Sequence, residues 1–547
     1  MTTGDKHNES ANEPATQAEK VVSLAKELYR FGQTPKHEPF AVKIDGSNVA
    51  LWLNGSGGAL KDAIAFAYRA QHNGVMNSTA FTDALCALRG EALTMQPESV
   101  SIRVGRSGGS VVLDLGRIDG SAALIGHGGG GWVVVPRSEI LFQRTALTGE
   151  LPMPTHGGSL EQLRELLNVT PETWPVLLAW LVAALIPDMP HPILMLGGQQ
   201  GTGKTTAARY ICGVFDPSDA PIRSQPRDPE AWSMSVANSW ATVIDNVSTI
   251  PEWWSDALCK AVTGDGFVRR MLYTNNEVSV LSFKRVIALT SIDAGALRGD
   301  LAERLLLVDL DPIPEDKRKS ELDLDKAYRA VHSSILGALL DLAGKVLYQL
   351  PKVQLTQLPR MADFAKVLAA VDAVLGTTSL ALYLDQSKRI ACDVLDADPV
   401  GTAIVNWMSR RGELWSGSAS QLMDEIKPDD PDRSWPRSPR GFGSRLRRLM
   451  PALALQGVIV TPPHRNDRKR DFVVQPIAQT ARQPENAIGG EESSSSGRAV
   501  ETTTAHPPID SPSEDVGLFD GDADSGRSGG SGCRLHTNVY GNEWGES

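Results

Sequence analysis

Residues His191 to Thr206 have the sequence HPILMLGGQQGTGKTT, and this stretch decides the fold of the chain. The apolar run from Ile193 to Leu196 predicts a buried strand, and the pattern from Ala207 to Val214 predicts a helix. Between them, Gly198, four further residues and Gly203-Lys204-Thr205 match a phosphate-binding loop. Strand, glycine loop and helix in this order are the context that the motif requires, so a chance match is much the weaker interpretation.

The residue types of this loop indicate which atoms would bind a nucleotide. Glycines let backbone N–H groups turn onto phosphate oxygens, and the start of the helix adds a positive dipole. Lys204 is expected to reach the β- and γ-phosphates of ATP, and the Thr205 hydroxyl is expected to bind Mg²⁺. The predicted nucleotide-binding residues of the loop are Gly198, Gln199, Gln200, Gly201, Thr202, Gly203, Lys204, Thr205 and Thr206.

A second apolar stretch, Trp240 to Ile244, predicts a strand that ends in Asp245 and Asn246. Asp245 is expected to hold the hydration shell of the Mg²⁺ ion. Many ATPases place Glu after this Asp to orient the attacking water, but Asn cannot accept its proton. Two alternatives follow: either Glu252 or Asp256 on the next predicted helix accepts the proton, or hydrolysis is slow.

Two further strands complete the predicted core. The strand from Arg285 to Leu289 precedes Thr290, a polar residue placed where a sensor would contact the γ-phosphate. Arg304 precedes the last strand, Leu305 to Leu310, and is a candidate arginine finger. The competing interpretation of Arg304 is a salt bridge to Asp300 or Glu303.

The C-terminal part of the body is basic. Residues 433–470 contain ten Lys or Arg residues against one acid, Asp467. Predicted helices at 418–426 and 442–455, followed by strands at 457–460 and 471–474, suggest a winged helix, and such a charge run favours contact with a DNA backbone. The alternative is a solvated basic face. The candidate DNA-binding residues, with two more from a predicted hairpin at 267–283, are Arg269, Arg270, Arg437, Arg440, Arg445, Arg447, Arg448, Arg465, Arg468, Lys469 and Arg470.

Length and composition limit the number of domains and the classes of protein to which the chain can belong. A chain of 547 residues is expected to form two to four domains. Its five cysteines are scattered, which favours reduced thiols in the cytoplasm and argues against a zinc site or disulfide framework. The longest apolar run, Trp174 to Ile186, has 13 residues and predicts a buried helix that is too short to span a bilayer. We therefore expect no membrane partner.

Linkers and changes in composition divide the chain into regions. Twelve Asp or Glu residues against four Lys or Arg residues lie between Thr480 and Ser547, so much of the net charge of −11 belongs to this tail. We predict an α/β protein with a P-loop ATPase core and a disordered acidic tail. The expected regions are 1–18 disordered, 19–150 an α+β domain of unknown role, 159–311 the ATPase core with N-terminal helices, 312–411 helical, 412–476 a winged-helix-like module and 480–547 the tail.

These motifs together resemble a known family. The chain resembles the primase-helicase-type ATP-binding proteins of bacterial prophages and integrative elements, which are related to the superfamily 3 branch of the AAA+ ATPases. The resemblance covers roughly residues 160–476. It is carried by Gly198–Thr205, Ile244–Ser248, Trp254–Cys259, Arg270–Thr274, Asp300–Arg304, Pro359–Phe364 and the basic module.

The resemblance implies a homo-oligomeric ring, usually a hexamer, that moves along DNA with ATP and works with other replication proteins. No primase constellation is recognisable in residues 19–150. The leading hypothesis is therefore an ATP-driven, helicase-like DNA motor for the replication of a phage or mobile element. The alternatives are a DNA-binding regulatory ATPase without unwinding activity, and a DNA-binding adaptor with a vestigial nucleotide site.

Overall fold

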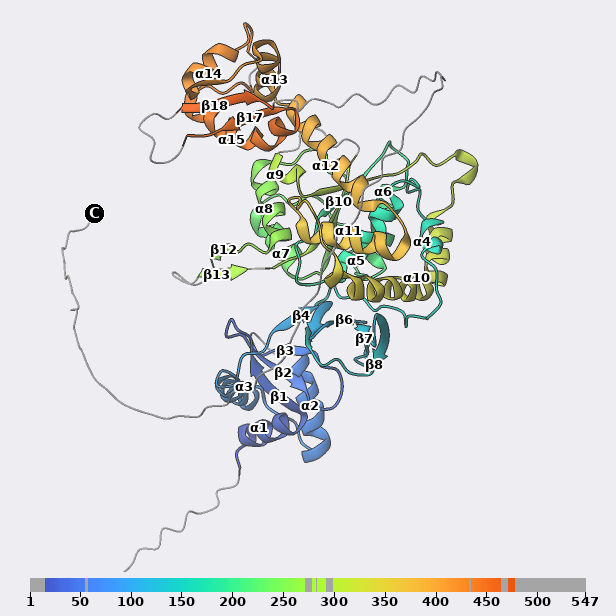
Figure 1. Ribbon diagram of the computed structural model, residues 1–547. Helices are drawn as coiled ribbons and strands as arrows, with labels where there is room; N and C mark the ends of the chain where they lie inside the picture. Colours follow the sequence, from blue (N-terminus) through green and yellow to red (C-terminus); the bar gives the residue numbers. More distant parts are fainter. Residues whose placement is uncertain are drawn as a thin grey trace, which may run out of the picture. The chain divides into compact units, whose positions relative to one another are not determined.

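The computed structural model describes residues 15–54, 58–270, 278–281, 283–291, 299–431, 434–463 and 471–477, and it is a mixed α/β structure (Figure 1). Side chains are not described in 267–270 and 278–281. The predicted disordered segments fall almost wholly outside the described residues. One correction applies at the N-terminus, because a Thr16–Glu19 capping box starts helix α1 at Gln17 rather than after residue 18.

A four-stranded parallel sheet forms the centre of the ATPase region. Its strand order is β11-β14-β10-β15, and all three neighbouring pairs are parallel. The strands are β10 (Ile193–Gly197), β11 (Ala241–Ile244), β14 (Val286–Thr290) and β15 (Leu305–Asp309). Because parallel strands share the direction of their ends, the residues that follow β10, β11 and β14 meet at one edge.

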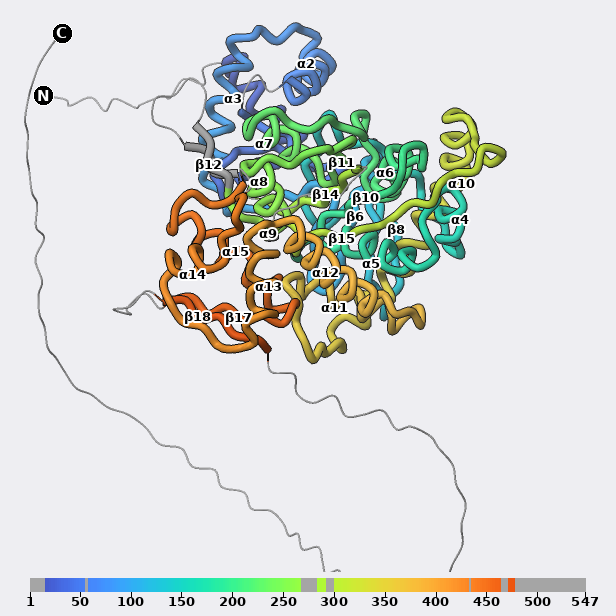
Figure 2. The backbone as a smooth tube through the Cα atoms, turned by 90° about the horizontal axis from the view of Figure 1, so that it is seen from above, coloured from blue at the N-terminus to red at the C-terminus, as the bar shows by residue number. Residues whose placement is uncertain are grey.

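Each face of this sheet is covered by apolar side chains, because alternate residues of a strand point to opposite sides. Leu194 and Leu196 join the larger apolar cluster, which also contains residues of α5, α10 and α11. Ile193 and Met195 join a second cluster with residues of α7 and α8. Figure 2 shows the four strands between these two groups of helices.

The helices of this region agree with most of the predicted segments. The predicted buried helix is α5, in which every residue except Pro175 is buried. The first of the predicted N-terminal helices of this region is the short α4. The helices are α4 (Glu161–Arg164), α5 (Trp174–Ala184), α6 (Lys204–Gly213), α7 (Pro229–Ala237), α8 (Glu252–Thr263), α9 (Gly299–Ala302), η1 (Glu315–Lys317), α10 (Glu321–Gln349), η2 (Leu350–Lys352), α11 (Ala362–Leu375) and α12 (Ser379–Asp396).

Helix α10 with η2 is, within the described residues, the one helix long and apolar enough to cross a membrane by length and composition. However, 61% of its apolar window is buried inside the protein. Its neighbours include β7, β8 and α11. This burial is that of a core helix.

The N-terminal region contains two antiparallel sheets. The first has the order β1-β2-β3 and is accompanied by α1, α2 and α3, whereas β5-β6-β7-β8 form a meander. Strand β1 follows α1 directly, and β4 pairs with β9 in parallel. The elements are α1 (Gln17–Leu28), β1 (Tyr29–Gln33), β2 (Pro39–Lys43), β3 (Ala50–Trp52), α2 (Gly58–His72), α3 (Ser78–Ala92), β4 (Val100–Ile102), β5 (Val104–Ser107), β6 (Ser110–Asp114), β7 (Ala122–His127), β8 (Gly131–Val135) and β9 (Leu141–Gln143).

The C-terminal module has its own apolar core, which includes Trp415, Phe442 and Phe472. Its three strands form an antiparallel sheet in the order β16-β18-β17. Strand β16 was not predicted. The elements are α13 (Pro399–Arg411), β16 (Trp415–Ser418), α14 (Ala419–Ile426), α15 (Pro439–Leu455), β17 (Val458–Thr461) and β18 (Asp471–Pro476), and the separate predicted hairpin is β12 (Phe267–Arg270) with β13 (Val278–Leu281).

One buried ion pair joins the N-terminal region to the ATPase region. Arg103, between β4 and β5, has a φ of 60°, and its buried Nε lies 2.7 Å from Oδ1 of Asp216. Its guanidinium also donates to the Gly149 carbonyl at 2.7 Å and the Asp114 carbonyl at 3.0 Å. The second Asp216 oxygen accepts the Ala241 N–H at 2.7 Å, at the start of β11. A left-handed arginine costs about 1–2 kcal/mol, and these bonds offset that cost.

We expect Arg103→Ala to destabilise the protein, because it removes the guanidinium that pairs with the buried Asp216 carboxylate, a change worth about 3–5 kcal/mol. The measurement is the midpoint of urea unfolding followed by tryptophan fluorescence. Arg106→Ala is the matched control, since it breaks an exposed pair with Asp188 and should cost no more than about 1 kcal/mol. Equal midpoints for the two variants would contradict this role of Arg103.

Candidate functional site

The phosphate-binding loop lies between β10 and α6, as the motif predicts. Gly198, Gly201 and Gly203 have φ values of 137°, 84° and 78°, which residues with a side chain rarely adopt. A Cβ on Gly198 would also come within 2.9 Å of the Leu310 carbonyl oxygen. The glycines are therefore needed for the shape of the loop as well as for access to it.

Lys204 is the first residue of α6, and the loop itself binds its ammonium. Nζ donates to the carbonyl oxygens of Gly198 at 2.7 Å and Gln199 at 2.8 Å. The buried Thr202 hydroxyl donates to the Gln199 carbonyl at 3.0 Å, and Asn168 donates to the Thr202 carbonyl at 3.3 Å. These contacts hold the loop closed around the lysine. Asn168 had no signal in the sequence, because it belongs to no motif.

Asp245 connects three parts of the site. The Thr205 hydroxyl lies 3.0 and 3.1 Å from the two carboxylate oxygens, and the Thr290 hydroxyl donates to the first of them. Thr290 in turn accepts the Asn246 N–H at 2.9 Å. Asn246 has a φ of 56°, a conformation that Asn adopts more readily than most residues. The side chains at the ends of β11 and β14 thus meet the start of α6.

A cavity of about 440 Å³ opens at this edge of the sheet. Gly198 and Gln199 are absent from its lining and act through their bonds to Lys204. Ser291 was not predicted as a site residue, although it follows Thr290 directly, and it is fixed by a 2.8 Å bond to the Val247 carbonyl. The lining residues are Gln200, Gly201, Thr202, Gly203, Lys204, Thr205, Thr206, Asp245, Asn246, Thr290 and Ser291.

The oxygen donors of this cavity fit a magnesium ion. Mg²⁺ prefers oxygen ligands and in nucleotide sites uses one or two protein oxygens together with phosphates and water. Thr205 and Asp245 are such a pair, and Lys204 supplies a cation beside them. With Mg²⁺ bound, these residues would hold a nucleotide triphosphate by its phosphate groups.

The cavity has a single carboxylate, that of Asp245, among the described residues that line it. Glu252 and Asp256, the two sequence candidates for a base, lie on α8 and are both exposed, and neither lines the cavity. Asn246 does line it. The cavity therefore offers an amide where an attacking water would need to lose a proton.

Arg304 lies away from this cavity. Its carbonyl accepts the Ile193 N–H at 2.8 Å, which puts Arg304 beside the amino end of β10, whereas the loop follows the carboxyl end. Its side chain is only 9% exposed, and Nη1 lies 2.8 Å from Asp300 Oδ1. Burial alone would raise the pKa of Asp300, but the bond to Arg304 and the charges of Arg304 and Arg360 bring that pKa below its usual value. The competing salt-bridge interpretation thus describes what Arg304 does within one chain.

The predicted DNA-binding arginines differ in their surroundings. Arg437, Arg440, Arg447 and Arg448 are exposed, and Arg447 lies over the Phe472 ring at 5.1 Å. Arg445 is different, because its Nε pairs with Asp398 Oδ2 at 2.7 Å and ties α15 to the start of α13. Arg445 therefore has a contact within the module, and its role as a DNA contact stays a prediction.

The remaining basic candidates have no described side chains. Arg269 and Arg270 form part of β12, but only their backbone is described. Four others, Arg465, Arg468, Lys469 and Arg470, lie outside the described residues.

Comparisons with known proteins agree with the coarser part of the resemblance. Residues 160–396 match the family model of the actinomycete integrative conjugative element replication protein, and residues 400–486 match the C-terminal domain model of the same RepA family. No curated protein matched the chain.

Two solved structures are similar at low identity. One is Cch of the type IV SCCmec element, an active helicase, with a TM-score of 0.42, 11% identity, and coverage of 82% of this chain and 93% of that one. The other is the apo C-terminal region of NrS-1, with a TM-score of 0.35, 10% identity, and coverage of 85% and 100%. At these TM-scores neither similarity carries an argument. By its two family matches, the chain is similar over residues 160–486 to the replication proteins of actinomycete integrative conjugative elements.

Proposed function

We propose that this chain is an ATP-hydrolysing DNA motor that serves the replication of an integrative mobile element. The single observation that carries the proposal is the cavity at which Lys204, Thr205, Asp245 and Thr290 meet. Hydrogen bonds connect the phosphate-binding loop, the metal-binding pair and the polar residue that follows β14. The name of the matched family supports replication as the setting.

Each residue of the set has a distinct task in this proposal. Lys204 exchanges its two carbonyl bonds for the β- and γ-phosphates of ATP. Thr205 and Asp245 would hold Mg²⁺, which would supply positive charge beside the phosphates. Thr290 fixes the Asp245 carboxylate and the backbone of Asn246 at the same time, so it would respond to the state of the γ-phosphate.

The C-terminal module is the proposed DNA-binding part. Its element order is a helix, a strand, two helices and two strands, with β18 between β16 and β17, which supports a winged helix. In such a module α15 would approach the DNA, and four exposed arginines (Arg437, Arg440, Arg447 and Arg448) precede it or lie on it. Their charge favours contact with the phosphate backbone.

The ring and its shared active site are part of the same proposal. A hexamer would place one subunit's arginine at the next subunit's γ-phosphate. Arg304 can serve as this arginine only if its ion pair with Asp300 opens, because its guanidinium is almost fully buried. The half-exposed Arg360, which pairs with both Asp300 and Glu303, would then compensate these carboxylates.

A regulatory ATPase without unwinding activity is the second candidate, and Asn246 favours it. Asp245 is committed to Thr205 and Thr290, and no other carboxylate among the described residues lines the cavity. Hydrolysis would then be slow, and ATP would act as a bound signal that switches assembly or DNA binding.

Lys204→Ala and Asp245→Ala are each expected to lower ATP turnover by at least about 100-fold, because each removes a main electrostatic stabiliser of the phosphates. The measurements are the steady-state ATPase rate and the circular dichroism spectrum of the same samples. Lys260→Ala, an exposed lysine on α8, is the control and should keep its activity. Normal turnover by a folded Lys204→Ala protein would refute the site.

Asn246→Glu and Asn246→Gln separate the two candidate functions. Both side chains pay a similar cost for the left-handed backbone at residue 246, but only Glu can accept a proton. If the missing base limits the rate, Glu should raise single-turnover hydrolysis by about tenfold or more, at the low end of the effect of a positioned base. Gln should not raise it. Equal rates for the two variants would mean that the base lies elsewhere.

Arg440→Glu with Arg448→Glu should weaken DNA binding and lower its salt dependence by about one unit of log–log slope per lost phosphate contact. Fluorescence anisotropy over a range of salt concentrations measures both quantities. Arg389→Glu, an exposed arginine on α12, is the charge-matched control. Unchanged affinity and slope in the double variant would place the DNA path away from α15.

A further inference from the structure

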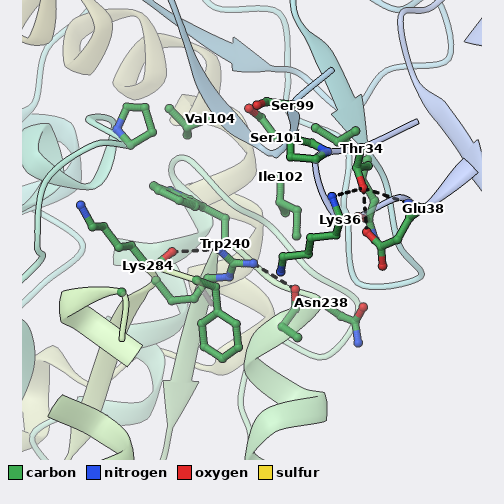
Figure 3. A pocket seen from close by; sticks show the side chains of 18 of the residues that line it. Thr34, Lys36, Glu38, Ser99, Ser101, Ile102, Val104, Asn238, Trp240 and Lys284 are labelled. Carbon is green, nitrogen blue, oxygen red and sulfur yellow. Dashed lines mark hydrogen bonds between the residues drawn. The ribbon is translucent and has the colours of Figure 1, made fainter. Parts of the chain in front are cut away.

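A second cleft lies at the other end of the parallel sheet from the phosphate-binding loop. It has a volume of about 860 Å³, within the range of ligand-binding sites. One wall comes from the β1–β2 turn, β3 and β4 of the N-terminal region (Figure 3). The other wall includes Trp240, directly before β11, and Arg285, directly before β14. Since these positions are amino ends of parallel strands, the cleft is separate from the ATP site.

The charge of this cleft is positive. Three cations line it, Lys36, Lys284 and Arg285, against the one acid Glu38, which accepts a 3.3 Å bond from the Thr34 hydroxyl. Figure 3 shows Lys36 extending from its wall toward the side that carries Trp240 and Asn238. Lysine and arginine on facing walls therefore share one space with little negative charge.

Arg285 and Lys284 are held in place by neutral groups. The Arg285 guanidinium donates to the carbonyls of Val236, Lys284 and Ala237 at 3.1, 2.8 and 3.0 Å. The Lys284 ammonium donates to the Asp188 carbonyl at 2.8 Å. Among the described residues neither forms an ion pair. Burial lowers the pKa of Arg285 to about 10, so its charge persists at neutral pH. The charge of Asp216 acts on Arg285 from a distance, but the bonds of both cations go to neutral carbonyls, which leaves them able to attract an anionic ligand.

The rest of the lining fits a nucleobase. Trp52 and Phe283 supply aromatic surface, and Ile102 and Val104 supply aliphatic surface. Hydroxyl and amide side chains stand beside them and can bond the edges of a base or a sugar, namely Ser99, Ser101, Asn54, Gln143 and Asn238. A simple inorganic anion would use only the cations, whereas a nucleotide would use every part of this lining.

We propose that the cleft between the N-terminal region and the amino end of the ATPase sheet binds a nucleotide unit, with its phosphate beside Lys36 and Arg285 and its base on the apolar wall. The nucleotide can be free or part of a DNA single strand, since both present the same phosphate and base. The site is independent of ATP hydrolysis at the phosphate-binding loop. It also gives the N-terminal region, which carries no catalytic cluster in the sequence, a ligand.

The test uses the full chain with Lys204→Ala, so that binding at the ATP site is suppressed. One probe is 5-iodo-dUMP, and the other is a 5′-phosphorylated oligo(dT) carrying one 5-iodouracil. After ultraviolet cross-linking, mass spectrometry locates the attached peptide. Attachment at Trp52 or within residues 99–104 supports the proposal. Attachment of the monomer alone identifies a free nucleotide, and attachment of the oligonucleotide identifies a DNA strand.

Variants of the cations supply the control. Lys36→Gln with Lys284→Gln should lower the cross-linking yield by about tenfold, which corresponds to the loss of one charge-assisted contact. Lys43→Gln, an exposed lysine on β2 outside the lining, should leave it unchanged. If the double variant does not fold, the exposed turn substitution Lys36→Gln alone should lower the yield by about fivefold. Attachment of neither probe in the cleft, or a full yield in a folded cation variant, would overturn the proposal.

Discussion

The carboxylate of Asp245 is the contact on which the site depends. It accepts from Thr205 at the start of α6 and from Thr290 at the end of β14, while Asp245 itself follows β11. Three segments that are far apart in the sequence are thereby held at one edge of the sheet. The order β11-β14-β10 makes this possible, because the strands that carry Asp245 and Thr290 lie on the same side of the loop strand.

The amino edge of the same sheet has an equivalent connection to the N-terminal region. Asp216, just after the loop helix α6, binds Arg103 with one oxygen and the first residue of β11 with the other. A shift of the N-terminal region would therefore move the start of β11, and Asp245 directly follows this strand. The cleft described above lies at this edge as well, so a ligand there would act on the same strand ends.

The sequence predicted the parts of the site that follow local rules. The spacing of the glycines predicted the loop. An apolar strand followed by a polar residue predicted both Asp245 and Thr290. Each of these patterns spans only a few consecutive residues, so it can be recognised in the sequence. Local sequence patterns cannot predict ion pairs or strand pairings between segments that are far apart in the sequence. The Arg445–Asp398 pair, for example, joins residues 47 positions apart. The left-handed Arg103 is set by its buried partner Asp216, and the short strand β16 by its pairing with β18.

In the proposed function, ATP hydrolysis at the Asp245 site drives movement on DNA. The most direct measurement is the strand separation of a forked duplex by the wild-type protein with ATP, compared with the same reaction with a non-hydrolysable ATP analogue. The proposed function requires that single strands accumulate with ATP alone and that ATP hydrolysis rises when single-stranded DNA is added. Hydrolysis that is indifferent to DNA, with no strand separation by a protein that still binds the fork, would contradict it.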